Sequence, residues 1–187
     1  KYPLFDVSKE YKLGVIIGGG LTAAVKAQAI LEFVNQFGSE IAIIHASSKN
    51  SLAYSSAKGK HFYCLVGNEG NRLTNVFKNI EEFAGVCVLP PSPRKMGTFV
   101  PKTLINDTME LSEVSFTDLL NDSHTTIALQ TAIDLGIRNC FVIGYDGYAD
   151  ETVGNKEQEL FVENETLFND AQQKGMNLTA LTPTKYK

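Results

Sequence analysis

Short runs of apolar residues alternate along this chain with segments in which apolar residues recur at helical spacing. The clearest case is residues 13–17, Leu-Gly-Val-Ile-Ile, which Gly18, Gly19 and Gly20 end abruptly. A continuous apolar run rich in β-branched residues is typical of a strand buried on both faces. From Leu21 the pattern changes to a stripe of period 3.6, which predicts a helix. This alternation limits the folds open to the chain.

The same pattern recurs to the end of the chain. Strands are predicted at residues 13–17, 41–44, 62–66, 86–89, 140–143 and 178–181, with helical stripes over 24–37, 73–83, 127–135 and 160–171. Residues 92–103 have the composition of a long loop, and 104–111 fit neither pattern. Strands that alternate with helices predict a mostly parallel, open sheet with helices on both faces. We therefore predict one three-layer, Rossmann-like α/β domain over residues 1–187, in which 1–11 form a linker or an edge segment.

Composition narrows the function classes. Hydrophobic residues make up 43% and charged residues 20% of the 187 residues, and the net charge of −4 comes without a long basic run. Binding to nucleic acid is therefore not expected. Cys64, Cys87 and Cys140 lie in apolar runs without Cys-x-x-Cys spacing, which favours buried thiols over disulfides or a zinc site. No apolar stretch has the length of a membrane span. We expect a cytoplasmic location, and the start at Lys1 suggests a piece of a larger protein.

Right-handed crossovers bring the carboxyl ends of parallel strands to one edge of a sheet, where open α/β sheets bind their ligands. Polar and glycine-rich segments follow several predicted strands. From them we select Asp146 as a candidate catalytic residue, and from the hydroxyl-rich start of the helix predicted near residue 125 we select His124 as a candidate acid or base. The candidate ligand-binding residues are Gly18, Gly19, Gly20, Leu21, His45, Ser47, Ser48, Lys49, Gly67, Asn68, Glu69, Ser123, Thr125 and Tyr145.

Each of these segments also has a purely structural interpretation. The contiguous glycines depart from the Gly-x-Gly-x-x-Gly dinucleotide pattern and could form a tight turn without a ligand. Residues 45–50 contain no acid to hold a ribose, which disfavours NAD. Asn68 and Ser123 could cap helices, and a lone histidine such as His124 more often caps or packs. No metal site is predicted in this chain, and no cofactor is identified.

Two stretches resemble a group that includes bacterial sialyltransferases and the 6-hydroxymethylpterin diphosphokinase-like proteins. These are the Gly-Gly-Gly-Leu turn at 18–21 and the stretch 131–146, Thr-Ala-Ile-Asp-Leu-Gly-Ile-Arg-Asn-Cys-Phe-Val-Ile-Gly-Tyr-Asp. Where that group has proline and serine after the glycines, this chain has Leu21 and Thr22. The resemblance implies a transferase or diphosphokinase that acts on a nucleotide-sugar or diphosphate donor, with Lys49 pairing with phosphate.

A second resemblance covers nearly the whole chain. It looks like the domain that follows the aldolase barrel in bacterial 4-hydroxy-2-oxovalerate aldolase-like (HMG-CoA lyase-like) proteins. In that family the barrel holds a divalent metal, Mn or Mg, through an aspartate and a His-x-His pair, and this chain has no His-x-His. The resemblance implies an accessory or regulatory domain that binds a nucleotide-like or phosphorylated ligand, beside a barrel of the same chain that carries the lyase chemistry. A protein-interaction module is the remaining alternative.

Overall fold

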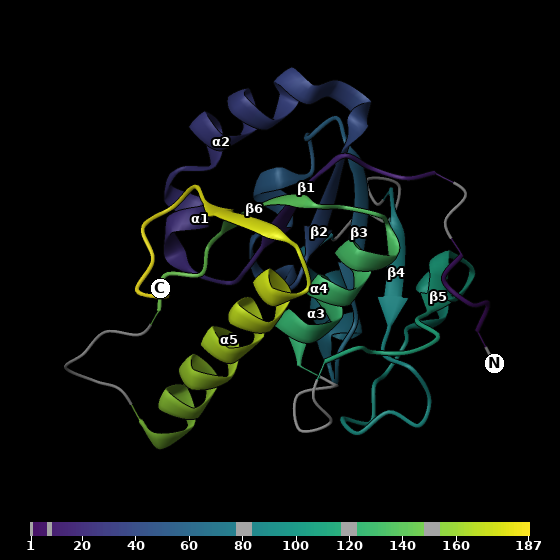
Figure 1. The fold of residues 1–187 in the computed structure, drawn as a ribbon. Helices are drawn as coiled ribbons and strands as arrows, with labels where there is room; N and C mark the ends of the chain where they lie inside the picture. Colours follow the sequence, from purple (N-terminus) through teal and green to yellow (C-terminus); the bar gives the residue numbers. More distant parts are fainter. Residues whose placement is uncertain (1, 7–8, 78–83, 117–122, 148–153) are drawn as a thin grey trace.

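A computed structural model describes residues 2–6, 9–77, 84–116, 123–147 and 154–187 (Figure 1). Their strands form one parallel sheet of seven strands in the order β5-β4-β3-β2-β1-β6-β7. The strands are β1 (Leu13–Ile17), β2 (Ile41–His45), β3 (Lys60–Cys64), β4 (Val86–Leu89), β5 (Thr108–Glu110), β6 (Asn139–Ile143) and β7 (Asn177–Ala180).

Helices cover both faces of this sheet. On one face lie α1 (Leu21–Val25), α2 (Ala27–Val34) and α3 (Glu69–Val76), and on the other α4 (His124–Asp134) and α5 (Asn155–Gln173). Short 3-10 segments are η1 (Asn35–Glu40), η2 (Ser48–Asn50), η3 (Leu52–Tyr54) and η5 (Lys102–Asp107). The architecture is the predicted three-layer, Rossmann-like α/β fold.

The two faces are packed differently. Under α4 and α5 a single cluster of buried apolar side chains runs from Phe5 to Met176. On the opposite face there are two clusters, one under α1 and α2 and one under α3. The buried imidazoles of His45 and His61 belong to neither cluster. Polar side chains are thus part of the core on that face.

Several boundaries differ from the sequence prediction. The stripe over 24–37 forms two helices separated at Lys26, whose backbone has left the helical region (φ −102°, ψ 12°). β5 comes from the stretch that fitted neither pattern. α5 begins at Asn155 rather than near residue 160, because the N–H of Gly154 donates to Glu157 and starts a polar first turn ahead of the apolar stripe. For the stripe over 73–83, residues 78–83 lie outside the described part of the chain.

The N-terminal residues join the sheet rather than forming a linker. Leu4 forms a parallel bridge with Glu110 of β5, and the N–H of Phe5 donates to the Glu110 carbonyl at 2.7 Å. The Phe5 ring is buried against Phe62. The described part of residues 1–11 is thus an edge segment beside β5.

Helix α4 lies in the interior, as its sequence predicts. All residues from 125 to 132 are buried. Ser123 caps the helix by accepting a hydrogen bond from the Thr126 N–H at 3.0 Å, and Gly136 follows its C-terminus with φ +74°. Cys64, Cys87 and Cys140 are free and buried. Within the described ranges, no helix has the length and apolarity that crossing a membrane requires.

The strand order creates a topological switch point. From β1 the chain builds the sheet outward to β5 and then returns to place β6 on the other side of β1. Crevices for ligands in open parallel sheets form at such a point, outside the carboxyl ends of the strands. The carboxyl edge beside β1 is therefore where a site is expected.

Candidate functional site

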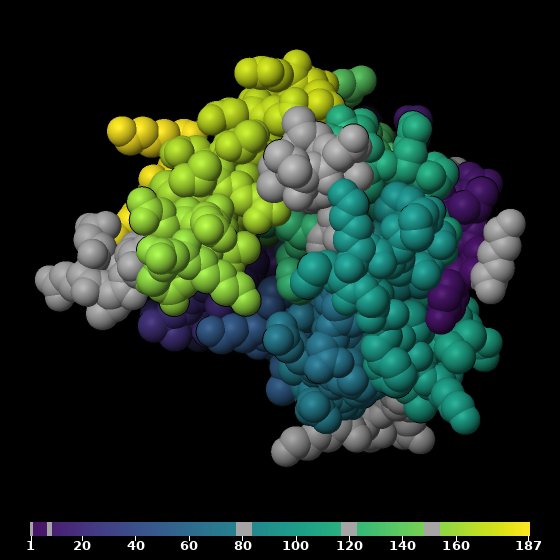
Figure 2. Space-filling view, turned by 90° about the horizontal axis from the view of Figure 1, so that it is seen from below, coloured from purple at the N-terminus to yellow at the C-terminus, as the bar shows by residue number. Residues whose placement is uncertain are grey.

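The carboxyl edge of the sheet carries a hollow. This edge is the lower side of Figure 1, toward which the β4 arrow points. Figure 2 views the molecule from that side and shows a hollow between α5, in yellow-green, and the blue and teal segments of the first half of the chain. The start of α4 and the turns that follow β2 and β3 supply the polar side chains described next.

The glycine turn after β1 packs tightly against the turn after β6. The N–H of Gly20 donates to the Gly144 carbonyl at 2.7 Å. A Cβ on Gly18 would lie 2.7 Å from that same oxygen, and one on Gly20 would lie 2.5 Å from it. These distances exclude a side chain at either position. Close approach of two backbone turns therefore accounts for Gly18 and Gly20 without a ligand.

Asp146 contacts the same turn. Its carboxylate accepts hydrogen bonds from the Thr22 N–H at 3.0 Å and from the Thr22 hydroxyl. The Asp146 carboxylate thus occupies the start of α1, where the sequence predicted either a bound ligand or a tight turn without one. Leu21, the first residue of α1, is exposed to solvent.

The polar segment after β2 divides between interior and surface. His45 is buried, with Nδ1 3.1 Å from Ser51 Oγ and Nε2 2.9 Å from His61 Nδ1. Burial and the neighbouring His61 lower the pKa of His45 well below its usual value, so its ring is neutral. Ser47 accepts from the Lys49 N–H, and the Lys49 side chain is exposed. His45 is therefore a core residue, whereas Lys49 can reach a ligand.

Glu69 is the centre of the polar cluster at this edge. Its side chain is only 2% exposed and accepts hydrogen bonds from the Ser48 N–H at 2.6 Å and the Ser48 hydroxyl at 2.5 Å. Arg72 and His124 Nε2 each lie 3.2 Å from Oε2. Burial alone would raise the pKa of this carboxyl group, but the hydrogen bonds from His124 and Ser48 outweigh it and lower the pKa to about 2. The cluster therefore holds a buried carboxylate that is charged at neutral pH.

His124 is hydrogen-bonded to this carboxylate and is partly open to solvent. It is the first residue of α4, and its side chain is 41% exposed. Among the described residues, the hydrogen bond of the ring is the one between Nε2 and Glu69. Glu163 of α5 also lies near His124. Burial raises the pKa of Glu163, although a hydrogen bond from Ser123 and the charge of His124 act to lower it. A half-exposed imidazole thus stands between carboxyl groups from α3 and α5.

Thr125 and Tyr145 belong to a buried hydrogen-bond network. The Thr125 hydroxyl donates to Asn164 Oδ1 at 2.6 Å and lies 3.2 Å from the Tyr145 hydroxyl. Both residues are buried, and burial raises the pKa of Tyr145. This network joins α4, α5 and the turn after β6. Thr125 and Tyr145 therefore have structural roles at the site.

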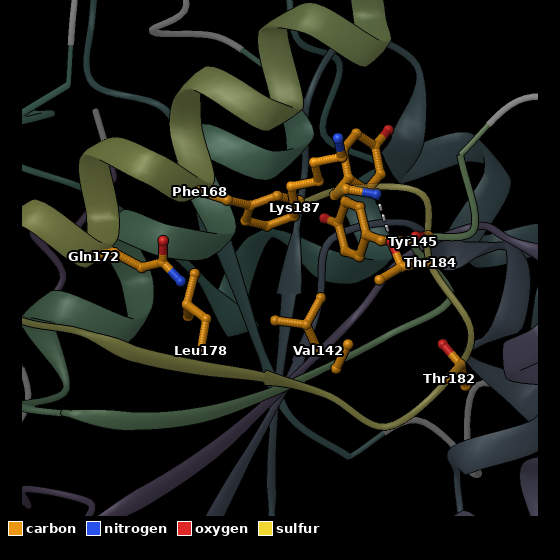
Figure 3. A pocket seen from close by; sticks show the side chains of 10 residues that line it. Val142, Tyr145, Phe168, Gln172, Leu178, Thr182, Thr184 and Lys187 are labelled. Atoms are coloured by element: carbon orange, nitrogen blue, oxygen red, sulfur yellow. Dashed lines mark hydrogen bonds between the residues drawn. The ribbon is translucent and has the colours of Figure 1, made fainter.

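Tyr145 also lines a small cavity between α5 and the edge of the sheet (Figure 3). In Figure 3 Phe168 and Gln172 approach from α5, and Leu178 approaches from β7. The cavity has a volume of about 100 Å³. Ligand pockets usually measure roughly 300–1,000 Å³, so a nucleotide would not fit here.

Gly67 and Asn68, after β3, shape the edge itself. Gly67 has φ +57°, its N–H donates to the Thr98 hydroxyl, and its carbonyl accepts from the Phe99 N–H. It thereby holds the 92–101 loop at this edge. Asn68 stands at the N-cap position of α3, but its side chain makes no capping hydrogen bond and instead accepts from the Asn71 side chain at 2.8 Å.

The structure brings part of the predicted site together. Ser48, Glu69 and His124 meet, and Ser123 precedes His124 and caps α4, whereas His45 is buried in the core and Asp146 is hydrogen-bonded to the α1 turn. Sequence reasoning selected neither Glu163 nor Asn164, because both lie on α5, where nothing distinguishes them from other polar residues of a surface helix. Arg72 lies three residues after Glu69 on α3 and forms an i,i+3 ion pair with it.

Among the described residues, no three His, Cys, Asp or Glu side chains converge as metal ligands would. Comparison with known protein family models, with curated proteins and with solved structures found no match for this chain.

Proposed function

We propose that the hollow at the carboxyl edge binds a small phosphorylated or nucleotide-like ligand, with His124 as its central contact. The observation that carries this proposal is the Glu69–His124 pair. A buried carboxylate held by Ser48 fixes Nε2 of a half-exposed imidazole, so the ring keeps one orientation toward the hollow. Pre-organised polar groups of this kind lower the entropic cost of binding a ligand.

Two cations beside the pair suit a phosphate. Arg72 is 66% exposed although it contacts Glu69, and the exposed Lys49 adjoins Ser48 in the chain. The N-terminus of α4 adds its helix dipole. Guanidinium and ammonium groups are the usual protein partners of phosphate oxygens. The acidic Glu163 on the far side favours a ligand that also has hydroxyl groups, such as a sugar or ribose.

The biological context of this proposal comes from the resemblance to aldolase-associated domains. In that context the domain is an accessory or regulatory unit beside a barrel of the same protein. The barrel would carry the divalent metal and the carbon–carbon lyase chemistry. The ligand bound here would then report on metabolism to the barrel.

A thermal-shift series tests the binding proposal. CMP, CDP, UDP, ATP and sugar phosphates are compared with the matching nucleosides and free sugars. A ligand at a hundredfold excess over its Kd stabilises the fold by about 2.7 kcal/mol. We expect a shift only with phosphorylated compounds, reduced in Arg72→Met and His124→Gln and retained in Lys102→Met, an exposed lysine of η5. No shift with any compound would refute the proposal and favour the interaction module.

A nucleotide-sugar transferase is the second candidate, and the same pair favours it. A carboxylate that orients an imidazole is the arrangement general acid–base catalysis uses. His124 would then be the acid or base and Lys49 a phosphate contact, while Asp146 positions the α1 turn. Turnover of a CMP-sugar that is lost in His124→Gln would support this function. Binding without turnover would leave the binding domain.

A further inference from the structure

A second cavity lies at the opposite, amino edge of the sheet. It has a volume of about 520 Å³, within the range of ligand pockets, and opens beside the first residues of β3. Its lining includes Lys9, Tyr11, Ser55, Lys58, Lys60 and His61. The N-terminal segment, the turn before β3 and β3 itself thus contribute to one cavity.

The charges around this cavity are mainly positive. Lys9 Nζ lies 3.7 Å from Glu40 Oε1 and 5.0 Å from the centre of the Tyr11 ring. Lys58 and Lys60 form no ion pair with any described residue. Three lysines therefore line the cavity, and only Lys9 has a carboxylate beside it, in a chain whose net charge is −4.

The inner wall of the cavity is rigid and uncharged. The Ala57 carbonyl accepts from His61 Nε2 at 2.9 Å, so Nδ1 of the neutral ring accepts from His45 Nε2. His45 Nδ1 then accepts from the Ser51 hydroxyl. Burial lowers the pKa of His61 and of His45, although the bond to Ala57 partly opposes the effect at His61. All four ring nitrogens are satisfied, so the positive charge of the cavity comes from its lysines.

We propose that the amino-edge cavity binds a compact polyanion, such as a diphosphate or triphosphate group. Lys60 begins β3, Lys58 lies in the turn before it and Lys9 belongs to the N-terminal segment, so the cations of the cavity come from two separate parts of the chain. The hydroxyls of Ser39 and Tyr11, which also line the cavity, can donate to further oxygens. This site is independent of the one proposed at the carboxyl edge.

Inorganic tripolyphosphate is the probe for this site. Its binding is measured by isothermal titration at low ionic strength and mapped by amide chemical shifts in the wild-type chain. We expect saturable binding at one site, with the largest shifts at residues 58–61. The double variant Lys58→Met/Lys60→Met should bind at least about tenfold more weakly, a loss of about 1.4 kcal/mol. ATP is the second ligand: equal affinity would mean that phosphates alone are recognised, and tighter binding that the nucleoside adds contacts.

The matched control is Lys26→Met/Lys102→Met, which removes the same charge from exposed lysines elsewhere. It should bind with nearly wild-type affinity. Equal weakening in both double variants would show non-specific charge attraction and overturn the proposal, as would the absence of saturable binding. Shifts confined to residues 47–49, 69–72 and 123–125 would also overturn it, because they would place the anion at the carboxyl edge. Wild-type mapping needs no variant, so the test stands even if a variant fails to fold.

Discussion

Replacing Glu69 with glutamine should change how the stability of the fold depends on pH. The Glu69 side chain is 2% exposed, and its contacts lower its pKa from 4.5 to about 2. At about 1.4 kcal/mol per pKa unit, the charged carboxylate stabilises the folded state by about 3 kcal/mol. Because the folded pKa is the lower one, this contribution is present above the unfolded pKa of 4.5 and is lost as the pH falls toward 2.

Urea unfolding followed by circular dichroism measures this effect. The free energy of unfolding is compared between wild type and Glu69→Gln at neutral pH and at about pH 2.5. The difference between the two proteins should shrink by about 2–3 kcal/mol on acidification, because glutamine has no charge to lose. Glu159→Gln, on the exposed face of α5, is the matched control and should follow the wild type at both pH values.

A difference between wild type and Glu69→Gln that stays constant with pH would refute the reasoning. It would show that Glu69 acts through packing or hydrogen bonds that a neutral amide can replace. Loss of stability in the Glu159→Gln control by a similar amount would instead assign the effect to the net charge of the whole chain.

Three further outcomes follow from the geometry. Wild type should begin to lose stability below about pH 6.5, before Glu69 titrates, because burial lowers the pKa of His45 and of His61 and the unfolded chain therefore binds protons first. His61→Gln should flatten that part of the pH profile measured by urea unfolding, and an unchanged profile would contradict the assignment. Gly20→Ala should destabilise the fold by roughly 1–3 kcal/mol in thermal unfolding, because its Cβ would meet the Gly144 carbonyl. Gly19→Ala should destabilise it less, because its Cβ would meet only the side chains of Ser47 and Lys49, and equal losses of stability would argue against the packed turn. Ser123→Ala should lower the free energy of unfolding by about 1 kcal/mol through loss of the α4 cap, while Ser123→Asn should keep most of the stability that the cap provides. An equal loss of stability in both variants would show that the cap contributes nothing.

The sequence predicted the fold better than the site. Buried parallel strands are continuous apolar runs, so β1, β2, β4 and β6 fall within one residue of their predicted bounds. β5 was not predicted, because its three residues, Thr-Met-Glu, contain no apolar run. It pairs with β4 and with the N-terminal segment at the edge of the sheet.

The sequence identified site residues from their place at the end of a strand or at the start of a helix, as for His124. Glu69 and Ser48 were selected because parallel strands end at one edge. Whether a side chain at that edge faces the hollow or the core depends on strand register and packing, which is why His45 was selected although it points inward. The bond from Asp146 to Thr22 spans 124 positions in the chain, and no local pattern signals it.

The imidazole pair between β2 and β3 fixes how these two strands align. Ile43 pairs with His61 and His45 with Tyr63, which sets the two rings diagonally across the strands. Sliding β3 by two positions would keep every apolar side chain on its proper face, so hydrophobic burial alone tolerates that error. The slide would separate His45 Nε2 from His61 Nδ1 and leave buried nitrogens without partners, at a cost of about 1–3 kcal/mol each. A polar pair inside an apolar layer thus selects one strand alignment among several that bury the apolar side chains equally well.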